Sequence, residues 1–130
     1  MKQTVEKIKT AIEALEKEHS SLLTICALIL RADPLEKWDV IVSASWLNPK
    51  EMQSYSVVSS KVRSVLDSSE VVQFSRIVIL DQKGPVISYL QSLQTITNGG
   101  VVELNVNDLS EKFKFSIKKA YLLRSQKLVI

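Results

Sequence analysis

The segment WDVIVSASWL, residues 38–47, decides the fold because it reads as a buried β-strand. It holds a β-branched run between two tryptophans, and Asn48-Pro49 follows it directly. β-Branched and aromatic side chains favour strands. Residues 40–44 lack the alternation of a strand with one wet face, so we expect both faces of this strand to be covered by other elements.

Two strand-turn-helix units occupy residues 38–96. After the first strand, Asn48-Pro49 offers an N-cap and a proline at the first helical position, which predicts that a helix begins there. Residues 76–80 (RIVIL) form the second predicted strand, and Gly84-Pro85 opens the helix after it. Successive units of this kind place their strands in parallel, joined by right-handed crossovers. We therefore expect residues 38–47 and 76–80 to be parallel neighbours.

The first 31 residues show heptad spacing. The positions are Val5, Ile8, Ile12, Leu15, His19, Leu22, Cys26 and Ile29. This 3,4 spacing predicts one long helix over residues 1–31. Its apolar stripe is narrow at first and broad later, which is typical of a helix that docks on the sheet with its second half and projects with its first. The alternative is an amphipathic helix that lies wholly on its own domain.

Residues 22–30 allow a second interpretation. They contain nine residues with threonine and two isoleucines, and such a short apolar run also fits a strand. That strand would turn at Asp33-Pro34 and pair antiparallel with residues 38–46. The unbroken heptad favours the helix, but both interpretations stay open.

The last segment has different patterning. Residues 101–106 and 113–118 alternate between apolar and polar side chains, which predicts an antiparallel hairpin over residues 101–124. The doublet Lys118-Lys119 interrupts the alternation and suggests a β-bulge. The predicted fold is therefore a single α/β domain with a four-stranded mixed sheet, helices on its faces, a long N-terminal helix and a C-terminal hairpin.

Composition restricts the class of protein. The 130 residues are 45% hydrophobic and 24% charged, with a net charge of +3 and one cysteine. No apolar run approaches the roughly 18 residues of a membrane span, so we expect a cytoplasmic protein that does not enter a membrane. The single cysteine excludes an internal disulfide.

A ligand in an open parallel sheet binds beyond the carboxyl ends of the strands. Here that edge would carry Trp46, Asn48, Asp81 and Lys83, which are our candidate ligand-binding residues. The alternative is that these residues only cap helices and form turns.

One set of residues gives a weak indication of a metal-dependent enzyme. Asp39 together with Asp81-Gln82-Lys83 resembles the Asp…Asp/Glu-x-Lys arrangement of metal-dependent nucleases of the restriction-endonuclease type. That resemblance implies two carboxylates holding Mg²⁺ and a lysine assisting the attacking water. The sequence departs from the pattern because a whole helix separates the two parts. Without a glycine-rich loop or a second histidine, we predict no metal site, no cofactor and no catalytic residues.

Nucleic-acid binding has its best case in the C-terminal segment. Residues 101–130 carry six basic and three acidic side chains. The candidate phosphate contacts are Lys114, Lys118, Lys119 and Arg124. Lysines on an edge strand also discourage unwanted pairing, and no aromatic side chains share their face, so we expect nucleic acid not to be the partner.

The leading functional prediction is a non-enzymatic interaction or regulatory module. We expect it to form a homodimer, through the N-terminal stripe or the hairpin edge, and to bind a protein partner. The predicted dimer contacts are Val5, Ile8, Ile12, Leu15 and His19. The alternatives are a small metal-dependent hydrolase or nuclease at the strand ends and a weak nucleic-acid binder.

Overall fold

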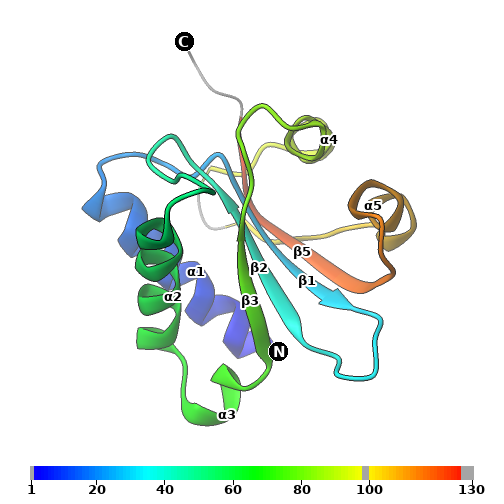
Figure 1. Cartoon of the computed structure of the whole chain (residues 1–130), viewed down its shortest axis with the longest axis horizontal. Helices are drawn as coiled ribbons and strands as arrows, with labels where there is room; N and C mark the ends of the chain where they lie inside the picture. Colours follow the sequence, from blue (N-terminus) through cyan, green and yellow to red (C-terminus); the bar gives the residue numbers. More distant parts are fainter. Residues whose placement is uncertain (1, 98–99, 127–130) are drawn as a thin grey trace.

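The structure is a computed structural model that describes residues 2–97 and 100–126. Five helices and five strands follow one another along these residues (Figure 1). In chain order they are α1 (Lys2–Glu18), β1 (Ile25–Arg31), β2 (Trp38–Ser43), α2 (Met52–Val65), α3 (Ser68–Val71), β3 (Phe74–Ile79), α4 (Pro85–Leu93), β4 (Val102–Glu103), α5 (Val106–Phe113) and β5 (Ile117–Ser125).

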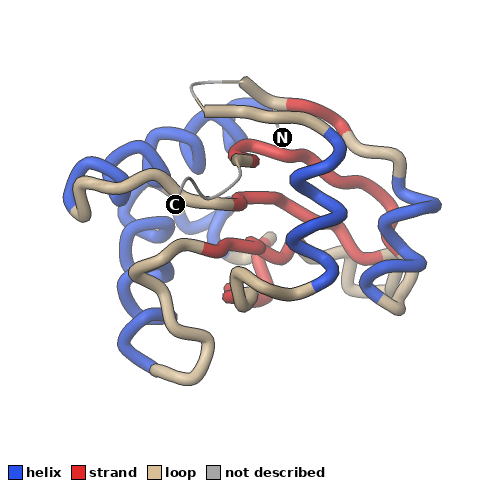
Figure 2. The backbone as a smooth tube through the Cα atoms, turned by 90° about the horizontal axis from the view of Figure 1, so that it is seen from above, coloured by secondary structure: helices blue, strands red, loops and turns tan. Residues whose placement is uncertain are grey.

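The strands form one mixed sheet in the order β3-β2-β1-β5-β4. β1 pairs antiparallel with β2 and β5, β4 pairs antiparallel with β5, and β3 runs parallel to β2. Helices α1 and α2 lie on one side of the sheet, and α4 and α5 lie on the other (Figures 1 and 2). Each side has its own buried apolar cluster, so the sheet is the middle layer of three.

Strand β2 covers the first six residues of the predicted strand 38–47, and residues 44–47 lie beyond its end. All six residues of β2 are buried. Its parallel neighbour is β3, with Asp39 beside Arg76 and Val42 beside Ile79. The predicted α/β fold with a mixed sheet is confirmed, although the sheet has five strands rather than four. The central position belongs to β1 and not to β2.

The prediction of one long N-terminal helix over residues 1–31 is wrong. Helix α1 ends at Glu18, Ser20 adopts a left-handed φ of 52°, and residues 25–31 form β1. β1 pairs with β2 in the register Ile25 to Ser43 and Leu30 to Trp38, which is the antiparallel arrangement of the second interpretation. The heptad continued past Ser20 because every residue from Ile25 to Leu30 is apolar, and a continuous apolar run fits any period.

The helix predicted at Asn48-Pro49 begins later. Helix α2 starts at Met52, and its N-cap, Glu51, makes no side-chain capping bond. Asn48 instead forms a turn ahead of the helix, in which its Oδ1 accepts the Lys50 N–H at 2.9 Å. Asn48 therefore has a local hydrogen-bonding role, but in a turn that precedes the helix and not as its N-cap.

The prediction of a C-terminal hairpin is only partly correct. β4 and β5 pair antiparallel, with Val102 beside Leu122, but helix α5 lies between them in the chain. The side chain of Asn105 caps α5 by accepting the Asn107 N–H. The predicted bulge is confirmed, because the register jumps from Lys119 to Ile117 and leaves Lys118 without an opposite residue.

Candidate functional site

The residues predicted at the ligand edge already have local roles. The Trp46 ring stacks on the His19 ring with 3.7 Å between centroids. Asp81 Oδ1 accepts the Lys83 N–H at 3.0 Å, and Asn48 forms the turn before α2. A cleft lies between α2 and β3, and Trp46, Asn48, Asp81 and Lys83 are not among the residues that line it.

The two aspartates of the nuclease-like pattern do not meet. Asp39 is fully buried near the start of β2, whereas Asp81 is exposed beyond the end of β3. Asp39 sits beside Arg76, and Asp81 lies five positions after Arg76 along extended chain, or about 16 Å away. No group of three His, Cys, Asp or Glu side chains that could hold a metal ion occurs among residues 2–97 and 100–126.

The four candidate nucleic-acid residues do not form one surface. Arg124 is 2% exposed and cannot reach a phosphate. Lys118 pairs with Glu36, and the Lys119 ammonium lies 5.6 Å from the centroid of the Tyr121 ring. Lys114 is exposed at the end of α5 and borders a hollow between α4 and α5.

The predicted dimer stripe lies inside the protein. Val5, Ile8, Ile12 and Leu15 belong to the apolar cluster between α1 and the sheet, and none is more than 6% exposed. They leave no surface for a second copy, so the alternative of a helix packed on its own sheet is the correct one. His19 is exposed just after α1 and stacks on Trp46.

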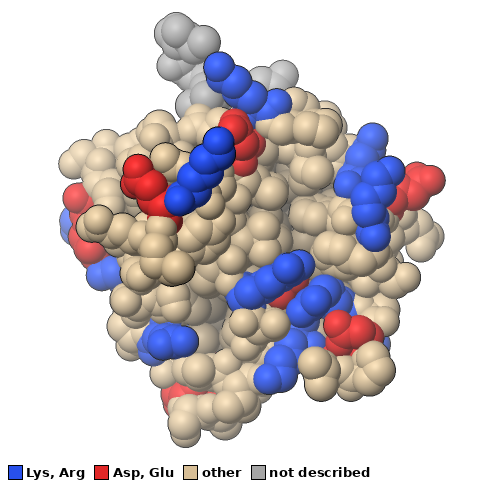
Figure 3. Space-filling view, in the orientation of Figure 1, with Lys and Arg blue, Asp and Glu red and all other residues tan. Residues whose placement is uncertain are grey.

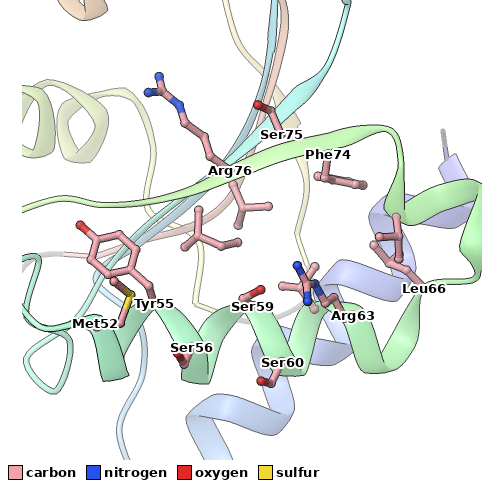
Figure 4. Close-up of a pocket in the computed structure, with 14 residues that line it drawn as sticks. Met52, Tyr55, Ser56, Ser59, Ser60, Arg63, Leu66, Phe74, Ser75 and Arg76 are labelled. Atoms are coloured by element: carbon pink, nitrogen blue, oxygen red, sulfur yellow. The ribbon is translucent and has the colours of Figure 1, made fainter.

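A cleft of about 440 Å³ opens between α2 and the edge strand β3 (Figure 4). Its apolar lining is Val40, Met52, Val62, Leu66, Val71, Phe74 and Ile77, and its polar lining is Tyr55, Ser56, Ser59, Ser60, Arg63, Ser75 and Arg76. The lining therefore combines an apolar floor with hydroxyl groups and two arginines. It includes no carboxylate.

The side chains of α2 point in two different directions at this cleft. Ser59 and Arg63 point toward β3, whereas Ser56 and Ser60 point away from it (Figure 4). At one end, the Tyr55 hydroxyl donates to the Pro49 carbonyl oxygen at 2.8 Å, which fixes that ring. Ser59 therefore occupies the part of α2 that any occupant of the cleft must contact.

The outer edge of β3 carries backbone groups that no other described strand pairs with. The Leu80 N–H donates to the Val42 carbonyl oxygen at 2.9 Å, so Leu80 faces β2. Backbone groups of successive residues in a strand point to opposite sides, so Val78 also faces β2 and Ile77 faces outward. Ile79 is 4% exposed, whereas Ile77 is only half-buried. The accessible edge is thus the first part of β3, directly beside the cleft.

Basic side chains gather on this edge of the molecule. Figure 3 shows lysine and arginine atoms clustered over the lower halves of β1, β2 and β3. Arg31 and Arg76 both contact the buried carboxylate of Asp39, through Nε at 3.3 and 3.1 Å from Oδ2. The Asp39 carboxylate therefore accepts a charged hydrogen bond from Arg76 and attracts the Arg31 guanidinium beside it.

Sequence reasoning missed this region. The edge position of β3 was not foreseen, because β1 was assigned to a helix. Two signals were available: Ser75-Arg76 places polar residues early in a strand, and α2 carries serines on several faces.

None of the described helices is long and apolar enough to cross a membrane. Comparison with known proteins adds no relative: no family model, no curated protein and no solved structure matches the chain.

Proposed function

We propose that this chain is a non-enzymatic interaction module that binds an extended acidic segment of a partner protein. The segment pairs with β3 as an additional strand and places alternate side chains in the cleft between α2 and β3. In this mode of recognition, main-chain hydrogen bonds supply affinity and pockets for alternate side chains supply specificity.

The observation that carries the proposal is the position of the cleft. A hollow of about 440 Å³ lies directly beside a strand edge with which no other described strand pairs. Its volume falls within the usual range of ligand sites, roughly 300 to 1,000 Å³. Met52, at its mouth, is 80% exposed and offers an adaptable apolar contact.

Charge argues for an acidic occupant. Arg63 and Arg76 border the cleft, whose lining has no acidic residue, although Arg76 shares the buried Asp39 with Arg31. Within the described chain Arg63 forms no ion pair. An acidic segment would neutralise both arginines and would approach faster than a neutral one.

A second copy of the chain fits the same edge less well. Pairing two β3 edges about a two-fold axis brings the same surface together on both sides, so each cleft and each Arg76 would face its own copy. Like charges opposite each other across paired strands are destabilising. The homodimer is therefore the competing occupant rather than the proposed one.

A library of short extended peptides displayed on phage tests the proposal. We expect enriched peptides to combine alternating apolar residues with acidic ones. Ser59→Trp fills the cleft and should weaken the binding of a synthetic copy of the best peptide by at least roughly tenfold, or about 1.4 kcal/mol. Gln53→Trp, on the same helix but outside the cleft lining, is the control and should leave binding unchanged.

Three results would overturn the proposal. One is the absence of any enriched peptide, and another is binding that Ser59→Trp does not affect while the melting temperature shows a folded variant. The third is a sedimentation mass of two chains that Ser59→Trp reduces to one, because a second copy would then be the occupant.

A further inference from the structure

Arg31, Asp39 and Arg76 form a cluster across three adjacent strands. Asp39 on β2 lies between Arg31 on β1 and Arg76 on β3. Both Nε atoms approach the same oxygen, Oδ2, while Oδ1 is buried without a hydrogen-bond partner. The Asp39 carboxylate accepts a hydrogen bond from Arg76 Nε and attracts the nearby Arg31 guanidinium without a hydrogen bond to its Nε.

The two arginines differ in which of their N–H groups remain available to a binding partner. Arg31 also donates from Nη2 to Ser75 Oγ at 3.2 Å, and its Nε lies 3.8 Å from the carboxylate of Asp33. The side chain of Arg76 is 51% exposed, and within the described residues its only polar partner is Asp39. The terminal nitrogens of Arg76 are therefore donors without an acceptor, on a side chain whose Nε is already fixed.

The face on which Arg76 lies follows from the strand. Ile77 belongs to the apolar cluster on the α1 and α2 side of the sheet. Because side chains alternate along a strand, Arg76 lies on the opposite side, where α4 and α5 pack. In Figure 4 its guanidinium points away from the cleft, whereas Arg63 points toward β3.

We infer that the partner segment carries an acidic side chain on the α4 and α5 side of the sheet, where Arg76 binds it. This inference rests on the proposed strand addition at β3. Neighbouring strands lie roughly 4.8 Å apart, so the residue beside Arg76 in an added strand is within reach of its guanidinium. Arginine contacts a carboxylate through two parallel N–H groups, which gives directional preference as well as attraction.

Asp39 is the positioning residue of this contact. It is fully buried and does not reach the partner, but its bond to Nε sets the direction of the Arg76 guanidinium. Arg63 lies on the other side of the added strand, so a single acidic residue of the partner contacts Arg76 or Arg63 and not both.

A double-mutant cycle tests the inference, with the best synthetic peptide from the library as the probe. Each acidic residue of the peptide is replaced in turn by its amide. At one position, the acid should bind the unmodified protein roughly tenfold more tightly than the amide, as a charged hydrogen bond predicts. Arg76→Gln should abolish that preference, and Arg63→Gln should preserve it at the same position.

Asp39→Asn probes the positioning role through a ratio. The readout is the affinity for the acidic peptide divided by that for its amide, because a general loss of folded protein lowers both affinities equally. We expect the ratio to fall toward one. An unchanged ratio in Asp39→Asn would remove the positioning role.

The inference fails if no acidic position couples to Arg76 while peptides still bind in a manner sensitive to Ser59→Trp; strand addition would then stand alone. It also fails, together with the proposed function, if no peptide binds the cleft. These two failures are distinguished by the Ser59→Trp variant.

Discussion

Glu16 and Arg124 form a buried ion pair between residues 108 positions apart in the sequence. Arg124 Nε and Nη2 both lie within 3.1–3.2 Å of the Glu16 carboxylate, and the two residues are 6% and 2% exposed. Arg124 Nη1 donates to the Leu123 carbonyl oxygen, and Glu16 also accepts the Leu23 N–H. The pair therefore connects α1 to β5 and to the start of β1.

Breaking this pair from one side should be costly. Arg124→Met leaves the Glu16 carboxylate buried without its cation, and we expect a loss of about 3 to 5 kcal/mol in the free energy of unfolding. Glu16→Leu combined with Arg124→Met removes both charges and should cost clearly less than the sum of the single changes. Urea denaturation measures all three variants. Strictly additive losses would mean that the two charges do not interact.

Acid should weaken the contact between α1 and α3. Glu70 accepts hydrogen bonds from Lys7 at 2.6 Å and Thr4 at 2.7 Å, and from the Asp67 N–H, and these bonds lower the pKa of its carboxyl. A lowered folded-state pKa stabilises the protein above the unfolded-state value and loses that contribution as pH falls through the folded-state value.

Glu70→Gln should therefore flatten the decline of stability below about pH 4.5, the ordinary glutamate pKa. The measurement is urea denaturation at a series of acidic pH values. Glu111→Gln, which removes the same charge from an exposed position on α5, is the matched control. Parallel pH profiles for the native chain and Glu70→Gln would contradict the assignment.

A substitution at Leu28 tests whether β1 is the central strand of the sheet. It is fully buried, and Leu28→Ala should lower the free energy of unfolding by about 2 to 5 kcal/mol through lost burial and the resulting cavity. Leu35 is 73% exposed in the loop after β1, and Leu35→Ala should change stability by less than about 0.5 kcal/mol. Similar effects in the two variants would place residue 28 at the surface.

Cys26 should be unreactive while the protein is folded. It is fully buried on β1, and burial raises the pKa of its thiol to about 12. The thiolate is the reactive form, so a thiol reagent at about pH 8 should modify the native chain only at the rate of unfolding. Modification should be rapid in urea. Rapid modification without urea would contradict the buried position.

The part of the fold that depends on local pattern could be predicted. Residues 38–47 contain a β-branched run between two tryptophans, and the parallel pairing of β2 with β3 follows from the strand-turn-helix order. Ile25–Arg31 could not be decided in the same way, because a wholly apolar segment is compatible with helix and strand. Only its antiparallel pairing on both sides, with β2 and β5, makes it the centre of the sheet.

The candidate site could not be predicted from the sequence, for a related reason. Which strand lies at an edge depends on the full strand order, and the sequence did not establish that residues 25–31 are one of the strands. Arg76, Arg31 and Asp39 are far apart in the chain, and their meeting depends on β1, β2 and β3 being neighbours. Trp46, Asn48, Asp81 and Lys83 were plausible from the carboxyl-end rule, but Asn48 and Asp81 accept hydrogen bonds within turns and the Trp46 ring stacks on His19.

Backbone amide exchange at Ile77 tests strand addition most directly. In the free protein, the Ile77 amide faces outward from β3 and should exchange much faster than that of Val78, which faces β2. Binding of the selected peptide should slow exchange at Ile77 and leave the already protected Val78 nearly unchanged. A peptide that binds tightly while Ile77 exchanges as fast as before would contradict the account, because the partner would then not be paired with β3.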